Sequence, residues 1–281
     1  MNRQNTHNPL SLNVTLNDEE LRKMRMNHSF WESNAEKFKA SNEVSWGDIN
    51  MMKLEIDNIL AYLPDRGLIL DAGCSNGFST YKVAKAKDAR IEAFDYSEKA
   101  IAIAKSRKKE KDPQDRIRFI EGNILNIPFQ DDHFNAAYTI RVLINLPNWK
   151  NQKKAILEIH RVLKPGGLYL MSEAFEGSLK KMNALRALAH LKPLKVHEFN
   201  LYLKETKCEE FLKPYFDIVA VRKFSSIYYV ASRFLRYLTM GKSDKDSFEN
   251  PINNFFAQYK ETENSGDFGI QKLYVLRKKR K

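Results

Sequence analysis

The stretch LDAGCSNG (residues 70–77) decides the fold, because it joins an apolar strand pattern to a turn that contains two glycines. Residues 67–69 (GLI) extend the strand pattern on the N-terminal side, and residues 78–87 (FSTYKVAKAK), which follow the turn, have the pattern of a helix. Two chemistries are consistent with the turn. Gly73 to Gly77 spells G-x-S-x-G, the elbow that exposes a nucleophilic serine. Asp71, ahead of the turn, also suits a loop that wraps a nucleotide-like cofactor.

Beyond this turn the chain keeps alternating strand patterns with helix patterns. Further strands are expected at RIEAFDYS, RIRFIEGN, FNAAYTIRVLI, GLYLMSEA, FDIVAVRKFS and FGIQKLYVLRKK, and helices at EKAIAIAKSRKKEK and WKNQKKAILEIHRVL. Strands and helices that alternate at these lengths form a parallel sheet covered on both faces. The sequence therefore predicts an α/β fold with a seven-stranded, mostly parallel sheet.

The remaining segments suggest how the chain is divided. Residues 1–45 are expected to be a polar and helical extension, frayed over about its first 25 residues, and residues 46–281 the main domain. Within that domain, residues 178–206 lack a strand pattern and are expected to form an inserted helical lid before the sixth strand. The polar stretch 241–268 is expected to be a mobile loop.

Composition narrows the class of protein. The chain has 281 residues, of which 43% are hydrophobic, enough for a large core. The two cysteines, Cys74 and Cys208, lie far apart and outside any metal-ligand spacing, so neither a disulfide framework nor a metal site is expected. No signal peptide or membrane-spanning run is apparent, and a soluble protein of the reducing cytoplasm is the expectation.

Positive charge is concentrated in the C-terminal part. Residues 178–281 hold 21 Lys and Arg against 11 Asp and Glu, which is +10 of the total net charge of +12. Such a field favours an anionic partner, whether a phosphorylated metabolite, nucleic acid or a membrane surface. Solubility alone would explain it equally well, and the closing RKKRK can be a solvated end.

The strand ends favour a cofactor site over the other two chemistries. Asp95 ends the second strand, 24 positions after Asp71, where a carboxylate can accept hydrogen bonds from both ribose hydroxyls. A hydrolase needs an acid and then a histidine after late strands, and the histidines here do not occupy such positions. A dinucleotide oxidoreductase prefers G-x-G-x-x-G, whereas this turn has no third glycine at the required place.

Several motifs in order resemble the class I S-adenosylmethionine-dependent methyltransferases, whose fold is Rossmann-like. Over about residues 45–176, LILDAGCSNG, EAFDYS, IEGNILNIPFQDDHFNAAYTI and EIHRVLKPGGLYLMSEA follow the motif order of that family. The sequence departs from the pattern at Ser75, which replaces a glycine, and at Asn123, where an acidic residue is common. An asparagine oxygen can still accept a hydrogen bond from an exocyclic amine.

The resemblance implies S-adenosylmethionine as cofactor and assigns contacts to it. We expect residues of the turn and of the fourth strand around the methionine portion and the ribose edge, namely Asp71, Gly73, Ser75, Gly77, Thr139 and Arg141. We expect residues at the ends of the second and third strands around the ribose and the adenine, namely Asp95, Tyr96, Asn123 and Ile124. An apolar residue such as Ile124 can also be ordinary core.

The acceptor side is predicted from position alone. His197 and Glu173 are the candidate general bases, although a surface role for His197 and an ion pair for Glu173 are the commoner fates. Arg141 is the candidate for binding an acidic substrate group, unless it pairs with a carboxylate. Aromatic residues and a cation are expected to form a sugar or phosphate pocket: Tyr202, Tyr228, Tyr229 and Arg233. Trp46 and Asp48 are expected to close the cofactor site.

The substrate class rests on a narrower resemblance. RVLINLPNWKNQKKAILEIHRVLKPGG, MNALRALAHLKPLKVHEFNLYLKE and FSSIYYVASRFL resemble methyltransferases that accompany bacterial surface-polysaccharide and lipopolysaccharide biosynthesis. This implies O-methylation of a small, anionic or sugar-like molecule. The charge leaves an RNA methyltransferase as an alternative, although TIRVLIN stands where an N-P-P-Y type motif is typical. A noncatalytic cofactor-binding subunit is the third possibility.

Overall fold

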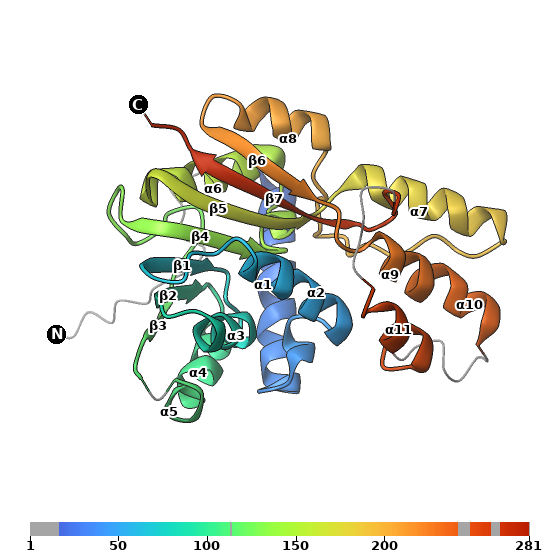
Figure 1. The fold of residues 1–281 in the computed structure, drawn as a ribbon, viewed down its shortest axis with the longest axis horizontal. Coiled ribbons are helices and arrows are strands. Elements are labelled where there is room, and N and C mark those ends of the chain that lie inside the picture. Colours follow the sequence, from blue (N-terminus) through green and yellow to red (C-terminus); the bar gives the residue numbers. More distant parts are fainter. Residues whose placement is uncertain (1–16, 113, 241–247, 260–264, 281) are drawn as a thin grey trace.

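A seven-stranded sheet forms the centre of the computed structural model, which describes residues 17–112, 114–240, 248–259 and 265–280 (Figure 1). The strands are β1 (Leu68–Ala72), β2 (Arg90–Asp95), β3 (Ile117–Glu121), β4 (Phe134–Ile140), β5 (Leu163–Ala174), β6 (Phe216–Arg222) and β7 (Gln271–Lys278). Their order is β3-β2-β1-β4-β5-β7-β6, and only β7 runs antiparallel to its neighbours. The predicted α/β fold with a mostly parallel sheet is confirmed.

Helices cover both faces of this sheet and one of its ends. They are α1 (Asp18–Phe38), α2 (Ile49–Leu60), α3 (Phe78–Ala86), α4 (Glu98–Ser106), α5 (Lys108–Lys111), α6 (Trp149–Val162), α7 (Glu176–Leu188), α8 (Glu205–Leu212), α9 (Ser226–Val230), α10 (Arg236–Thr239) and α11 (Pro251–Phe256). Three short turns are η1 (Asn42–Val44), η2 (Leu143–Asn145) and the π-helical η3 (Ala231–Leu235). Figure 1 shows α7, α9, α10 and α11 gathered at one end of the sheet.

Alternation along the strands separates two hydrophobic cores. Leu170 of β5 belongs to the core that includes Ile59 of α2 and Val83 of α3. Met171, the next residue, belongs to the opposite core with Ile156 of α6 and Leu212 of α8. Successive strand side chains point to opposite faces, so both faces of a sheet covered by helices have to be apolar. This explains the continuous apolar runs in the sequence.

The helix α1 begins earlier than the sequence suggested. Residues 18–25, expected to be frayed, form its first turns, while residues 1–16 of the expected polar end lie outside the described residues. Asn17 and Glu20 form a reciprocal capping box at its start. Glu20 also accepts a hydrogen bond from Asn148 at the start of α6. Local capping and this tertiary contact together stabilise a segment whose composition is polar.

The C-terminal part also differs from expectation. α11 lies inside the stretch 241–268, which was expected to be a mobile loop, and Asn250 caps it. Residues 241–247 and 260–264 of that stretch lie outside the described residues. Lys278, expected in a solvated basic end, belongs to β7 and donates hydrogen bonds to Asp132 and to the Leu163 carbonyl. The domain boundary at residue 45 and the lid at 178–206 stay predictions.

The two cores lead to a stability prediction. Leu170→Ala and Met171→Ala each empty a fully buried position on opposite faces of β5. Each should lower the free energy of unfolding by about 2–5 kcal/mol in urea denaturation. Val219→Ala, on the edge strand β6 where the side chain is 46% exposed, is the matched control and should change it by less than about 0.5 kcal/mol. Equal effects at all three positions would contradict this description of the core.

Candidate functional site

The turn after β1 adopts a conformation that depends on glycine at both ends. Gly73 has φ +89° and Gly77 has φ +77°, and Ser75 between them also has a positive φ of +49°. A Cβ on Gly73 would collide with the side chain of Val142, and one on Gly77 would lie 2.9 Å from the ring of Phe119. The turn therefore allows a close approach of other groups to its backbone, as a cofactor-binding loop requires.

Asp95, the last residue of β2, fixes this turn from the neighbouring strand. Its Oδ2 accepts a hydrogen bond from the Ser75 N–H at 2.8 Å and its Oδ1 accepts one from the Ser97 N–H at 2.9 Å. Burial raises the pKa of Asp95, and the backbone donors oppose that effect. Each carboxylate oxygen has a further lone pair for a ribose hydroxyl. The same acid can thus hold the turn and bind a nucleoside.

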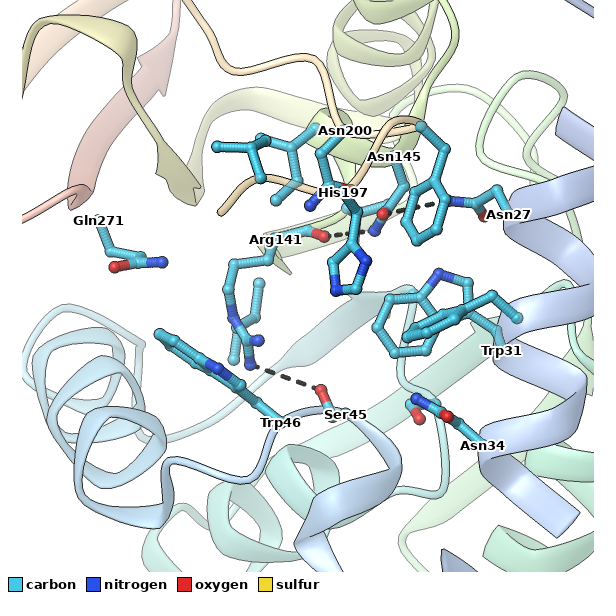
Figure 2. A pocket seen from close by; sticks show the side chains of 18 of the residues that line it. Asn27, Trp31, Asn34, Ser45, Trp46, Arg141, Asn145, His197, Asn200 and Gln271 are labelled. Atoms are coloured by element: carbon cyan, nitrogen blue, oxygen red, sulfur yellow. Dashed lines mark hydrogen bonds between the residues drawn. The ribbon is translucent and has the colours of Figure 1, made fainter. Parts of the chain in front are cut away.

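A cavity of about 720 Å³ opens at the carboxyl ends of β1, β2 and β4 and continues towards η3 and β7 (Figure 2). Ligands of open α/β sheets bind at these strand ends. Figure 2 shows Trp31 and Asn34 of α1 on one side of the cavity and Gln271 of β7 on the other. The helix α1, which sequence analysis did not connect with the site, therefore forms one wall.

Most of the residues predicted to bind the cofactor line this cavity. They are Gly73, Ser75, Asp95, Tyr96, Asn123, Ile124 and Arg141. Tyr96 donates a hydrogen bond to Asn27 of α1, and the amide of Asn27 donates in turn to Asn145 at 3.1 Å. The α1 wall is thereby linked both to the tip of β2 and to η2, beyond the tip of β4.

Asp71, predicted to contact the cofactor, is not among the residues that line the cavity. Its Oδ2 accepts hydrogen bonds from Tyr138 at 2.6 Å, Thr80 at 2.7 Å and Ser79 at 3.2 Å. Burial raises the pKa of this carboxyl to about 6 despite these donors. Asp71 lies within β1, so its side chain points into the layer beneath α3 and joins the strand to that helix.

Gly77 and Thr139 are also displaced from their predicted roles. Gly77 precedes α3 and does not line the cavity, so it acts through the shape of the turn. Thr139 lies within β4, is fully buried and shares a 3.0 Å hydrogen bond with the Tyr169 hydroxyl. The Gly77 backbone and the Thr139 side chain therefore have structural roles.

Glu173 is not placed to act as a general base. Its side chain is fully buried in β5 and accepts hydrogen bonds from the backbone N–H groups of Val142, Leu143 and Ile144 at 3.0–3.4 Å. These are the orphan donors at the start of η2. Burial raises the pKa of Glu173 to about 7, against the effect of the three donors. The acid thus holds the chain that follows β4.

Arg141 lies at the cavity but is already paired. Its Nε donates to Glu55 Oε2 at 3.1 Å. Its guanidinium lies 4.5 Å from the centre of the Trp46 ring, and Figure 2 shows Arg141 beside Trp46. Glu55 is fully buried in α2 and also accepts from Ser172 at 3.3 Å. Burial raises the pKa of Glu55 to about 7, with Arg141 opposing the shift. Sequence analysis missed Glu55, although a lone acid within the apolar stripe of that helix was the available signal.

His197 lines the mouth of the cavity, in the segment that follows α7. Its ring stacks on Phe199 with centroids 5.1 Å apart and an angle of 6° between the planes, and Phe30 of α1 lies 5.0 Å away. Figure 2 shows the imidazole pointing into the cavity. Of the two candidate bases, His197 is the one that the fold brings to the cavity.

The other end of the cavity is aromatic and cationic. Trp46, Tyr202, Tyr229 and Arg233 line it, whereas Tyr228 lies behind it and donates to Asp48 at 2.6 Å. The buried Asp48 also forms an ion pair with Arg233 at 2.6 Å, so it acts through that arginine. Arg236, which the sequence analysis did not single out, lines the cavity as well.

Two further observations concern metal ions and membranes. Within the described ranges, His, Cys, Asp and Glu side chains form no cluster that could hold a metal ion. Among the helices that the structure describes, none has the length and apolar character needed to span a membrane.

Comparison with known sequences points to one family. Residues 69–167 match the model of a methyltransferase domain. The chain is 31% identical over 107 residues to an O-methyltransferase of Aspergillus nomiae NRRL, covering 38% of this chain and 46% of that protein. It is 31% identical over 121 residues to the 2-phytyl-1,4-naphtoquinone methyltransferase of Nostoc punctiforme, covering 42% and 51%. The chain thus spans about half or less of the length of these curated relatives.

Solved structures show the same fold. The PH0226 protein from Pyrococcus horikoshii OT3 aligns with a TM-score of 0.55 at 16% identity, over 86% of this chain and 93% of that one. A geranyl diphosphate methyltransferase in complex with GPP and sinefungin aligns with a TM-score of 0.53 at 15% identity, over 81% and 76%. Identities this low establish the fold alone.

The strand order, the glycine turn and the acid at the tip of β2 define a Rossmann-like domain for an adenosyl-type cofactor. Residues 69–167 of this fold match a methyltransferase domain, and S-adenosylmethionine is the cofactor that this match implies.

Burial of Glu173 leads to a prediction about pH. Its pKa is about 7 in the folded protein and near 4.5 when exposed, so the folded state binds more protons between these values. The free energy of unfolding should therefore fall as the pH rises from about 4.5 to 7, by at most about 1.4 kcal/mol per pH unit from this group. In Glu173→Gln, urea denaturation between pH 5 and 7 should show a flatter dependence than in the wild type. If the free energies of unfolding of Glu173→Gln and of the wild type changed with pH in parallel, the proton would bind to a group other than Glu173.

Proposed function

We propose that this chain transfers the methyl group of S-adenosylmethionine to a hydroxyl oxygen of a small polar molecule, a sugar or a phosphorylated precursor of a bacterial surface glycan. The observation that carries the proposal is the continuity of one cavity from the Asp95 tip to the aromatic and cationic end near Arg233. Its volume is in the range of about 300–1,000 Å³ that is usual for small-molecule sites.

The residues at the strand tips fit the cofactor. Gly73 and Ser75 of the turn line the cavity, and Asp95 offers acceptor positions for the ribose hydroxyls. Tyr96 and Ile124 provide faces for the adenine, with Asn123 beside them. When bound, S-adenosylmethionine supplies a methyl group on a positively charged sulfur, which is an activated leaving group.

The residues of this chain then act mainly by positioning. Holding the acceptor oxygen in line with the methyl carbon removes orientational entropy, and effective molarities for such alignment are worth up to about 7–11 kcal/mol. The walls from α1 and the His197 segment enclose the reacting groups. His197 takes the proton of the acceptor hydroxyl, because its ring points into the cavity and Glu173 is committed to η2.

The basic C-terminal part favours RNA as a second candidate acceptor, because it carries most of the net charge. Part of this charge has a structural role, however. Lys272 is buried between Glu205 and Asp267, and Lys278 is paired with Asp132. A noncatalytic subunit is the third candidate. Transfer of labelled methyl groups to separated nucleic acid, lipid-linked glycan and soluble nucleotide-sugar fractions of a lysate distinguishes the three, and we expect the label in a glycan precursor.

The cofactor end is tested by Asp95→Asn. The amide retains one acceptor oxygen but loses the charge, so S-adenosylmethionine should bind about 10 to 100 times more weakly in calorimetry, as expected for a lost charged hydrogen bond. Asp88→Asn, an exposed acid before the opposite end of β2, is the control and should bind like the wild type. If the wild type showed no saturable binding of S-adenosylmethionine, the proposed function would be wrong. If Asp95→Asn bound S-adenosylmethionine like the wild type, the cofactor would not be held by Asp95.

The base is tested by His197→Asn. Removal of a general base should reduce the rate of methyl transfer to the labelled fraction by about 10²-fold or more, while the affinity for S-adenosylmethionine stays within about twofold. His190→Asn, on the same segment but outside the cavity lining, should transfer methyl groups at the wild-type rate. A wild-type rate in His197→Asn would show that the acceptor needs no base from this residue.

A further inference from the structure

Two arginines from consecutive helical turns line the acceptor end of the cavity. Arg233 of η3 is 6% exposed and Arg236 of α10 is 1% exposed, although arginine is almost never this buried unless it is paired. Both residues line the same cavity. The π-helical turn η3 changes the local register, and such turns are frequent at functional sites.

The bonds of Arg233 leave part of its guanidinium available. Nη1 pairs with Asp48 at 2.6 Å and donates to the Ser232 hydroxyl at 2.8 Å. Both of these contacts use Nη1, so Nε and Nη2 form the other edge of the planar group. Arginine binds carboxylates and phosphates through two parallel donors of one edge of its planar group. The Nε–Nη2 edge of Arg233 is such a donor pair.

Aromatic rings hold this guanidinium in place. Its central carbon lies 4.7 Å from the ring centre of Tyr229, 4.6 Å from Phe248 and 5.6 Å from Trp46. Contacts with several ring faces restrict rotation of the long side chain. A donor group that is already ordered loses less conformational entropy when a ligand binds. The arrangement therefore suits recognition of a fixed, planar acceptor pair.

The electrostatics of this end favour an anion. Arg186 of α7 is also buried, and it donates a hydrogen bond to the Arg233 carbonyl. Burial lowers the pKa of Arg186, and the charges of Arg233 and Arg236 lower it further. Like charges held close together out of water repel one another strongly, and an anion between or beside them relieves that repulsion.

We propose that the methyl acceptor carries an oxyanion, a phosphate or a carboxylate, and that the Nε–Nη2 edge of Arg233 binds it at the acceptor end of the cavity. Arg236 adds positive potential beside it. Arg141, for which sequence analysis predicted this task, is paired with Glu55. The inference rests on the proposed function in one respect, which is that this end of the cavity receives the acceptor.

The test uses the full chain and three sugars that differ in charge. Glucose 6-phosphate, glucuronate and neutral glucose are titrated by calorimetry, with and without saturating S-adenosylhomocysteine. At least one anionic sugar should bind about tenfold or more tightly than glucose, and the better of the two identifies phosphate or carboxylate as the preferred group. Equal binding of all three, or no binding of either anion, would overturn the proposal.

Arg233→Lys tests the residue while retaining a positive charge beside Asp48. It should weaken binding of the preferred anionic sugar about 10- to 100-fold, because a lysine lacks the two-donor edge, and leave S-adenosylhomocysteine affinity unchanged. The double variant Asp48→Asn/Arg233→Gln, which leaves no buried charge unpaired, should lose the same binding. Arg222→Lys on the exposed face of β6 is the control and should bind like the wild type.

Two results separate this inference from the proposed function. Wild-type affinity for the anionic sugar in Arg233→Lys would overturn the assignment of Arg233, whatever happens to the cofactor. Failure of the wild type to bind S-adenosylhomocysteine, with anion binding and its loss in Arg233→Lys intact, would instead overturn the methyltransferase activity and leave the oxyanion site standing.

Discussion

The hydrogen bond from the Ser75 backbone to Asp95 is the interaction on which the site depends. It joins the turn after β1 to the tip of β2, so the floor of the cavity is set by two neighbouring strands rather than by a loop alone. The turn can meet Asp95 only with positive φ at Gly73, Ser75 and Gly77. A parallel sheet brings the two tips to one edge, and burial makes the carboxylate costly unless it is hydrogen-bonded. The same strand tips and hydrogen bond therefore belong both to the fold and to the cofactor site.

The architecture could be predicted because its signal is repeated along the chain. Apolar runs of strand length between helical patterns are sufficient for a helix-covered parallel sheet. The start of α1 at Asp18 could not be predicted in this way, because that segment is polar and is stabilised by a capping box and by Asn148. The helix α11 inside residues 241–268 is a similar case, since a short polar helix depends on its cap and its neighbours.

The errors in the site have a common geometric cause. Asp71, Thr139 and Glu173 lie within their strands, and alternation turns each side chain into a buried layer where it bonds to hydroxyl or backbone groups. Asp95, at its strand end, and Arg141, just beyond one, reach the cavity instead. Sequence indicates which residues are near a strand tip, whereas the exact end of a strand decides which of them faces a ligand. The residues of α1 and η3 that line the cavity are brought there by tertiary packing, and no sequence motif indicates them.

Charge balance explains why one buried acid, Asp48, caps α2 and a second, Glu55, lies within that helix. A cavity that is to hold a cationic sulfonium already contains Arg141 and Arg233, and three cations in a region of low dielectric would repel one another. Glu55 pairs with Arg141 and Asp48 with Arg233, while the Trp46 ring lies 4.5 Å from the first guanidinium and 5.6 Å from the second. Both acids therefore neutralise arginines without occupying the cavity. Removal of one acid would leave an unpaired buried cation, which costs more than the loss of both partners. The helix α2 and its N-cap residue thus set the electrostatic conditions under which a cationic cofactor and an anionic acceptor can share one cavity.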